Sequence, residues 1–205
     1  MKLLTFVGCV IQIISLYPKF LFLFAPYHYM YETTWDYYGK VQAYYGVWSI
    51  CYILIGELSG EIICPGIGAE VPAYVVFTRM GSIISIILMI VFFVSAAIFI
   101  GDTCKIKFIN GIFSKIAFAS QAGHVVILIM TVPGMLTGAK SDAVSENELY
   151  IRWSFYMGYL DIVFTILSAV AAGAGAFVPD AKATRKQKPL NKVAAKEKQD
   201  KQTTE

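Results

Sequence analysis

Charged side chains are scarce in this chain of 205 residues: Asp, Glu, Lys and Arg make up 15% of it, against about 25% in an ordinary soluble protein. Hydrophobic residues make up 57%, and the mean hydropathy is +0.62. A chain of 22.7 kDa cannot bury that much apolar surface in one water-soluble core, and a long disordered chain would need the opposite composition. The net charge of +3, with no basic stripe, argues against nucleic-acid binding. The composition indicates a protein of the lipid bilayer.

The residues of enzyme chemistry are also few. The chain has two His and four Cys, and its sequence contains no Cys-x-x-Cys redox pair, no phosphate-binding loop, no metal-ligand cluster and no Ser–His–Asp arrangement. We therefore predict that the protein is not an enzyme and that it holds neither a cofactor nor a metal.

Long apolar runs are what the sequence does have. A helix needs about 20 apolar residues to cross a hydrocarbon core of roughly 30 Å, and four stretches reach that length: 3–25, 80–100, 116–136 and 155–177. They predict a membrane all-α four-helix transmembrane bundle over residues 1–177, with long loops at 26–78 and 137–153. The first stretch also resembles a secretory signal, an alternative that would leave three spans.

Basic residues gather on one side of these spans. Lys2, the loop at 101–115 and the chain after Phe177 hold twelve of the seventeen Lys and Arg residues. By the positive-inside rule, both termini are expected in the cytoplasm and both long loops outside the cell. Residues 178–205 are rich in basic and poor in apolar side chains, which predicts a disordered basic cytoplasmic tail. Cys104 lies in the cytoplasmic loop and is a candidate for reversible palmitoylation, with an unmodified thiol as the alternative.

The first outer loop, residues 26–78, has the composition of a β layer rather than of a linker. Tyr, Trp, Val and Ile are frequent in it, and these residues pack well on a pleated surface. We expect one strand over 41–54 and a second over 61–64, separated by glycines.

Two of the four cysteines, Cys51 and Cys64, lie in this loop, in an oxidising compartment. The other two, Cys9 and Cys104, lie within the first span and on the cytoplasmic side. A Cys51–Cys64 disulfide is therefore the one bridge that this topology allows, with two free extracellular thiols as the alternative.

Six residues of the first loop form a spaced pattern: Trp35, Gly46, Val47, Trp48, Cys51 and Cys64. Their order resembles the W–GLW–C–C signature of the claudin superfamily, with Val47 where the family usually has Leu. That superfamily includes claudins, peripheral myelin and epithelial membrane proteins, and the gamma subunits of voltage-gated calcium channels. Arg79, just before the second span, and the stretch at 155–159 are similar to further family positions. The resemblance covers about residues 1–177.

The resemblance implies a left-handed four-helix bundle capped by a small extracellular antiparallel β-sheet, built mostly from the first loop with one strand from the second. It implies that Trp35 and Trp48 are buried against the membrane interface and the helix ends. A generic aromatic belt is the alternative for these two residues. It also implies a multi-pass protein of the plasma membrane at cell junctions.

The carboxy-terminal sequence departs from the pattern of many claudins. The last residue is Glu205, whereas strand addition to a PDZ domain uses a hydrophobic terminal residue. This departure puts coupling to a PDZ scaffold in doubt.

Lys19 and Asp161 are the charged residues expected within the spans. Each lies about six residues from the outer end of its span, which places both roughly 9 Å below the membrane boundary. An ion pair between them would neutralise both charges. The alternative is that Lys19 extends to the surface beside a kink at Pro18.

Three further polar residues, Gln12, Gln121 and His124, are expected in the cytoplasmic half of the spans. Gln121 and His124 share one helix face because they are three residues apart. Hydrogen bonds between helices account for such residues better than a proton relay or a metal site does.

These observations support two hypotheses of function. The first is a claudin-like integral membrane protein that mediates cell–cell adhesion or a paracellular barrier, through self-association or claudin-like neighbours in cis and in trans. The alternative is an auxiliary, gamma-like subunit that modulates or traffics an ion channel or receptor. In the first case the acidic first loop, with five carboxylates against Lys40, predicts a preference for cations.

Overall fold

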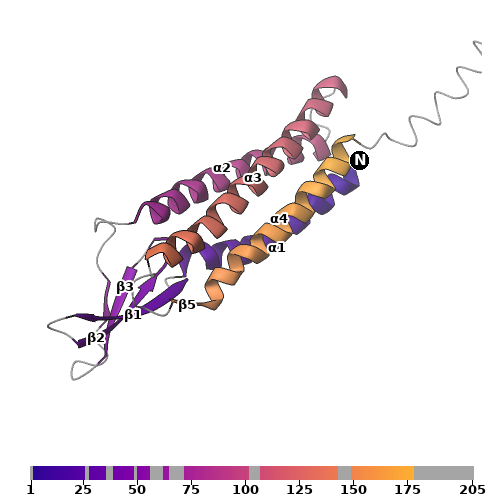
Figure 1. Cartoon of the computed structure of the whole chain (residues 1–205). Coiled ribbons are helices and arrows are strands. Elements are labelled where there is room, and N and C mark those ends of the chain that lie inside the picture. The colour runs from indigo at the N-terminus through magenta and orange to yellow at the C-terminus, as the bar shows by residue number, and fades with distance from the viewer. Residues whose placement is uncertain are drawn as a thin grey trace, which may run out of the picture.

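Four long helices form a bundle with a β-sheet at one end (Figure 1). The computed structural model describes residues 2–25, 28–35, 39–48, 50–55, 62–64, 72–101, 107–142 and 149–177. The helices are α1 (Lys2–Phe24), α2 (Ala73–Gly101), α3 (Lys107–Asp142) and α4 (Trp153–Phe177). In Figure 1, α1 lies beside α4 and α2 beside α3, and the start of the chain lies at the end of the bundle opposite to the sheet.

All four helices are long and apolar enough to cross a membrane. In helix α1 the distribution of side chains fits a membrane-spanning helix, because large apolar residues face outward. These residues are Leu3, Phe6, Val10, Ile13, Ile14, Tyr17 and Phe20. Its buried face is mostly small or polar: Thr5, Gly8, Gln12, Ser15, Pro18, Lys19, Phe22 and Leu23. A helix in water would be the reverse, so this arrangement indicates that lipid surrounds the bundle.

Two helices extend beyond the predicted spans. Helix α2 begins at Ala73 rather than near residue 80. Helix α3 runs from Lys107 to Asp142 rather than over 116–136, so residues 107–115, expected in the cytoplasmic loop, are helical. Residues 73–78 and 137–142, expected in the loops, are therefore helical. The reason is that the sheet packs on these extra turns, where Tyr74 and Ala139 contact the same hydrophobic core as the strands.

Five antiparallel strands form the sheet, in the spatial order β4-β3-β2-β1-β5. Their bounds are β1 (Tyr29–Trp35), β2 (Gly39–Tyr45), β3 (Ile50–Ile55), β4 (Ile62–Ile63) and β5 (Leu149–Ile151). Strand β5 comes from the second outer loop, and its Tyr150 is paired with Met30 of β1. A small antiparallel sheet built from both loops is thus confirmed, and β4 lies within the expected strand at 61–64.

The single strand expected over 41–54 is wrong. The chain forms two strands there, β2 and β3, in a hairpin whose pairing begins at Tyr45 and Ile50. The residues between them include Val47, which is fully buried, and Trp48, which packs against the core. Because these turn residues are themselves apolar, the hydrophobic run continues through the turn and hides it.

One hydrophobic core joins the sheet to the bundle. Phe22 of α1, Tyr29 and Tyr45 of the sheet, Val132 of α3 and Phe155 of α4 belong to the same buried cluster. A smaller cluster of Phe92, Ala96, Ala117 and Ala172 lies elsewhere in the bundle. The shared core fixes the sheet on the helix ends.

Candidate functional site

The interior of the bundle holds a cluster of polar side chains from all four helices, which we call the polar network. Its members are Gln12, Ser15 and Lys19 of α1, Ser85 of α2, Gln121 and His124 of α3, and Asp161 and Thr165 of α4. All of them are buried, and the most accessible, Lys19, is only 3% exposed. Polar side chains in such a place must satisfy one another, because lipid offers no hydrogen bonds.

Lys19 lies at the centre of the polar network. Its Nζ is 3.3 Å from Oδ2 of Asp161. It donates hydrogen bonds of 2.6 Å to Oγ of Ser85 and to Nε2 of His124. The structure therefore brings the two predicted charges together and places Lys19 in the interior rather than at the membrane surface.

The contact with Lys19 also defines the protonation of His124. An ammonium group only donates, so Nε2 of His124 must accept, and the ring proton of the neutral imidazole is then on Nδ1. That Nδ1 atom is buried and has no hydrogen-bond partner among the residues that the structure describes. His124 thus serves as an acceptor for Lys19 and not as a second cation.

The rest of the polar network joins α1 to α3 and supports Asp161. Gln121 Nε2 donates to Oε1 of Gln12, and Gln12 Nε2 donates to Oγ of Ser15 over 2.8 Å. Thr165 Oγ1 donates to Oδ1 of Asp161 over 3.3 Å. The hydrogen bond between helices that was expected of Gln12 and Gln121 is therefore present.

Sequence reasoning missed Ser15, Ser85 and Thr165 as members of this network. The helical period carried a signal for two of them. Ser15 lies three residues after Gln12, and Thr165 lies four residues after Asp161, so each shares a face with a polar residue already singled out. No comparable signal exists for Ser85, because α2 has no charged residue between Met80 and Ile100.

The polar network is suited to holding the helices together. Within the described part of the chain, no group of three or more His, Cys, Asp or Glu is placed to hold a metal ion. The paired charges neutralise each other, as charges inside a membrane usually must. Separating the helices would leave Lys19 and Asp161 uncompensated, so the network favours this one packing of the four helices.

A second group of predicted residues lies where the sheet meets α2, and we call it the loop anchor: Gly46, Val47, Trp48 and Arg79. Nε of Arg79 donates a 2.8 Å hydrogen bond to the carbonyl oxygen of Val47. Its guanidinium carbon lies 5.6 Å from the centroid of the Trp48 ring, within the range of a cation–π contact. The loop anchor ties the β2–β3 turn to the second helix.

The disulfide between Cys51 and Cys64 is present in the structure. It joins β3 to the residue that follows β4, so it fastens the edge strand of the sheet. Cys9 of α1 is a free cysteine. The pairing predicted for the first loop is confirmed.

Some predicted residues lie outside the described part of the chain. The backbone of Trp35 ends β1 and pairs with Gly39, but its side chain is not among the described ones. Cys104 and the tail at 178–205 also lie outside the described residues. The burial of Trp35, the palmitoylation of Cys104 and the disorder of the tail stay predictions.

His28 is a junction residue that sequence reasoning missed. Its backbone N–H donates to Tyr45 and its carbonyl accepts from Arg152, each over 2.8 Å. Its ring stacks on Phe22 at 4.8 Å between centroids, and its Nδ1 lies 3.1 Å from Oγ of Ser154. Burial of the ring lowers the pKa of His28 to about 4. A lone His between a span and a strand has no pattern that marks it.

No protein-family model and no curated protein matches the chain. The resemblance of the first loop to the claudin signature therefore stays a prediction from the sequence.

Proposed function

We propose that the chain is a claudin-like protein of the plasma membrane that mediates cell–cell adhesion or a paracellular barrier at cell junctions. The sheet is the part of the molecule that makes the contacts, with copies in the same membrane and across from it. Four helices long enough to span a membrane and a disulfide-linked sheet at one end of them support this function.

The observation that carries the proposal is the outward face of the sheet, which is the face opposite to the one that packs on the helix ends through Ala43 and Tyr45. Three large apolar side chains on this face are exposed: Ile55, Ile62 and Tyr150. Beside them, Gln42 donates to Glu32 over 2.8 Å and accepts from Tyr44 over 2.9 Å. Apolar groups next to an ordered polar row are typical of a surface that binds another protein.

The proposal is tested by expressing the chain in epithelial cells that lack other claudins. We expect continuous strands in freeze-fracture images and a change in transepithelial resistance. Ile62→Glu is expected to abolish both, since it places a charge in the contact face. The matched control is Ile63→Glu, because Ile63 is the next residue of β4 and is exposed (39%), but belongs to the opposite face.

Surface labelling shows whether either variant reaches the plasma membrane. The proposal would be contradicted if cells with normal surface expression of the wild-type chain formed no strands and showed unchanged transepithelial resistance. An Ile62→Glu variant that forms strands as well as the wild type would also contradict it.

The second candidate function is an auxiliary subunit that modulates or traffics an ion channel or receptor. It is supported by an apolar groove of 510 Å³ between α3 and α4, lined by Phe118, Ala122, Val125, Ile166, Ala169, Val170, Gly173 and Ala174. Small residues allow close approach of another transmembrane helix. This function is supported if one channel or receptor co-purifies with the chain in stoichiometric amount. The Ala174→Leu variant, whose larger side chain fills the groove, is then expected to abolish the co-purification. Val163→Leu, on another exposed part of α4, is the matched control.

A further inference from the structure

Arg152, between β5 and α4, lines a pocket on the outward face of the sheet. The pocket has a volume of 320 Å³, and the other described residues that line it are Tyr44, Ile53 and Trp153. The guanidinium carbon lies 5.9 Å from the centroid of the Tyr44 ring. Nη2 contacts Sδ of Met30 at 3.2 Å. The side chain is therefore held in a defined position against the sheet.

The positive charge of Arg152 has no counter-charge among the residues that the structure describes. The one hydrogen bond of the guanidinium to these residues goes to the thioether sulfur of Met30, which is a weak acceptor, and Nε makes none to them. Arg79 differs, because its Nε is bonded to a backbone carbonyl, and Lys19 differs because it has Asp161. A guanidinium with unused donors beside a pocket is suited to an oxyanion ligand, which it binds with two parallel hydrogen bonds.

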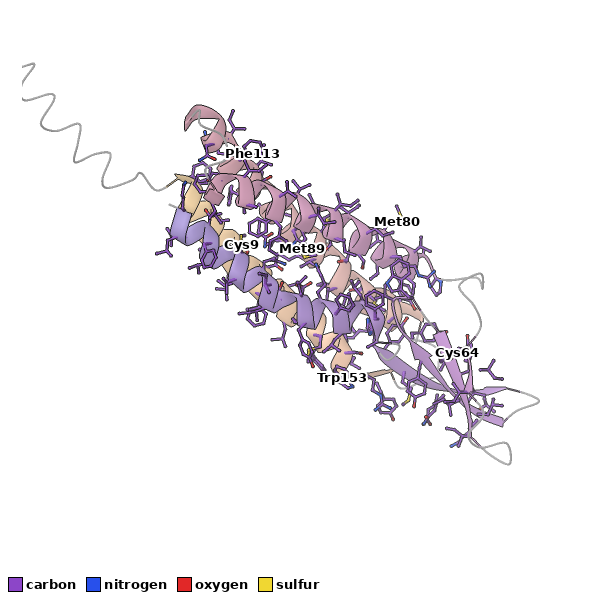
Figure 2. All side chains as sticks on the ribbon, turned by 180° about the vertical axis from the view of Figure 1, so that it is seen from behind. Cys9, Cys64, Met80, Met89, Phe113 and Trp153 are labelled. Carbon is purple, nitrogen blue, oxygen red and sulfur yellow. A yellow bond between two sulfur atoms is a disulfide. The ribbon has the colours of Figure 1, made fainter. Side chains whose placement is uncertain are left out.

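The pocket lies at the end of the bundle that carries the sheet. Trp153 is the first residue of α4, is 54% exposed and lies where the bundle meets the sheet (Figure 2). Tryptophan prefers the interface between lipid headgroups and hydrocarbon. An anion at Arg152 would therefore lie among the headgroups of the leaflet on the sheet side.

An exposed stripe runs along α4 and begins at Trp153, which lines the pocket. Its members recur at intervals of three and four residues: Trp153, Tyr156, Leu160, Val163, Leu167 and Val170. The ten helical steps from Trp153 to Val163 cover roughly 15 Å at 1.5 Å per step, which is about half of a 30 Å hydrocarbon core. That length matches one acyl chain reaching from the headgroup to the midplane.

We propose that the Arg152 pocket binds the phosphate of a glycerophospholipid from this leaflet, with one acyl chain lying along the α4 stripe. The guanidinium donates to the phosphate oxygens, and the Trp153 ring lies at the boundary between the headgroup and the chain. This site depends on the helices spanning a membrane and not on the proposed role in cell contacts.

The test measures lipid binding to the full chain, purified in a mild detergent, by native mass spectrometry with added phosphatidylcholine. We expect Arg152→Gln to weaken binding of the tightest lipid about tenfold or more, as expected for loss of hydrogen bonds to a charged group. Lys40→Gln is the matched control, because Lys40 is an exposed cation of the same sheet outside the pocket. The control is expected to bind phosphatidylcholine like the wild type.

Two further binding measurements identify which part of the lipid is recognised. Diacylglycerol, which has acyl chains but no phosphate, is expected to bind the wild type as weakly as phosphatidylcholine binds Arg152→Gln. Inorganic phosphate at millimolar concentration is expected not to displace the lipid; displacement would mean that a free anion suffices and would overturn the acyl-chain part of the proposal.

Two variants keep the test decisive if Arg152→Gln does not fold. Arg152→Lys keeps the charge but not the fork of donors, and Trp153→Ala keeps the guanidinium but removes a pocket wall; each is expected to weaken binding. Equal lipid binding by the wild type and all folded variants would overturn the proposal. So would a loss of self-association in Arg152→Gln with lipid binding unchanged, because the pocket would then be a protein contact.

Discussion

Lys19 meets a polar group from each of the three other helices: Ser85 of α2, His124 of α3 and Asp161 of α4. The sequence named Asp161 as a candidate partner, because opposite charges at equal depth in a membrane can neutralise each other, but it left open that Lys19 extends to the surface instead. It was not sufficient to predict that His124 joins them. Depth counted along the chain cannot say which helix face turns toward Lys19, since that depends on how the four helices rotate and pack.

Removing the carboxylate at Asp161 is expected to destabilise the bundle strongly. Asp161→Asn leaves the Lys19 ammonium buried without a counter-charge, which costs about 3–5 kcal/mol. The change is measured as a lower thermal unfolding temperature in detergent and as reduced surface expression. The double variant Lys19→Met/Asp161→Leu removes both charges and is the control; we expect it to recover most of the loss. An Asp161→Asn protein as stable as the wild type would contradict the structural role of the pair.

His28 is expected to make stability depend on pH. Its pKa in the folded protein is about 4, below the 6.5 of a free side chain, so the unfolded chain binds more protons between these values. The free energy of unfolding is therefore highest above pH 6.5 as far as His28 is concerned, and it decreases as the pH is lowered toward 4. The difference amounts to about 3 kcal/mol across this range.

The measurement compares thermal unfolding of the wild type and His28→Asn from pH 7 to pH 4. The amide of Asn retains a polar group near Ser154 but does not titrate, so carboxylates contribute equally to both curves. We expect the wild type to lose more stability than the variant over this interval. Parallel curves would exclude a titration of His28 coupled to folding.

At the level of elements, α2 and α3 approach each other closely at glycines. A Cβ added to Gly138 of α3 would overlap the Cβ and Cγ atoms of Tyr74, which are near the backbone of α2 and cannot move easily. At Gly123 of the same helix, a Cβ would make an ordinary contact of 3.5 Å with Leu88. One helix thus offers both a tight and a tolerant glycine.

Gly138→Ala is expected to lower the thermal unfolding temperature in detergent, because α2 and α3 must separate to admit the methyl group, at a cost of about 1–3 kcal/mol. Gly123→Ala is expected to be neutral or stabilising by up to about 1 kcal/mol, since Ala favours a helix over Gly. If Gly123→Ala lowered the unfolding temperature more than Gly138→Ala does, α2 and α3 would have to pack differently around Gly138 and Tyr74.

The disulfide is expected to stabilise the sheet. Joining Cys51 to Cys64 closes a short loop and contributes about 3 kcal/mol in the chain-entropy account. Cys51→Ser/Cys64→Ser is expected to lower the unfolding temperature, and a reducing agent should shift the wild type to the same value. Cys9→Ser, which removes the free cysteine of α1, is the control and is expected to respond to the reducing agent like the wild type.

The elements differ in how well the sequence predicts them. Helices α1 and α4 lie within two residues of the predicted spans, because continuous apolar length is a direct signal of a span. The β2–β3 turn was missed because Val47 and Trp48 face the core instead of water. The outer turns of α2 and α3 were missed because polar residues such as Arg79 end an apolar run without ending a helix.

For the whole molecule, one end differs from the other in chemistry. The sheet end combines the disulfide, the loop anchor and the outward face of the sheet, and it shares its core with the helices. The composition predicted a membrane protein, and the spacing of Trp and Cys predicted a resemblance to claudins. Neither revealed which face of the sheet turns outward, because that depends on how the strands pack on the helix ends, where Tyr29 and Tyr45 join the core of the bundle.

The most direct test of the proposed role is a mixed-cell contact assay. Cells without endogenous claudins express the full chain with a fluorescent label, and they are cultured with unlabelled cells that either express the chain or lack it. We predict that the label concentrates at borders between two expressing cells and stays uniform where the neighbour lacks the chain. A uniform distribution at both kinds of border, with normal surface expression, would contradict a role in contacts between cells.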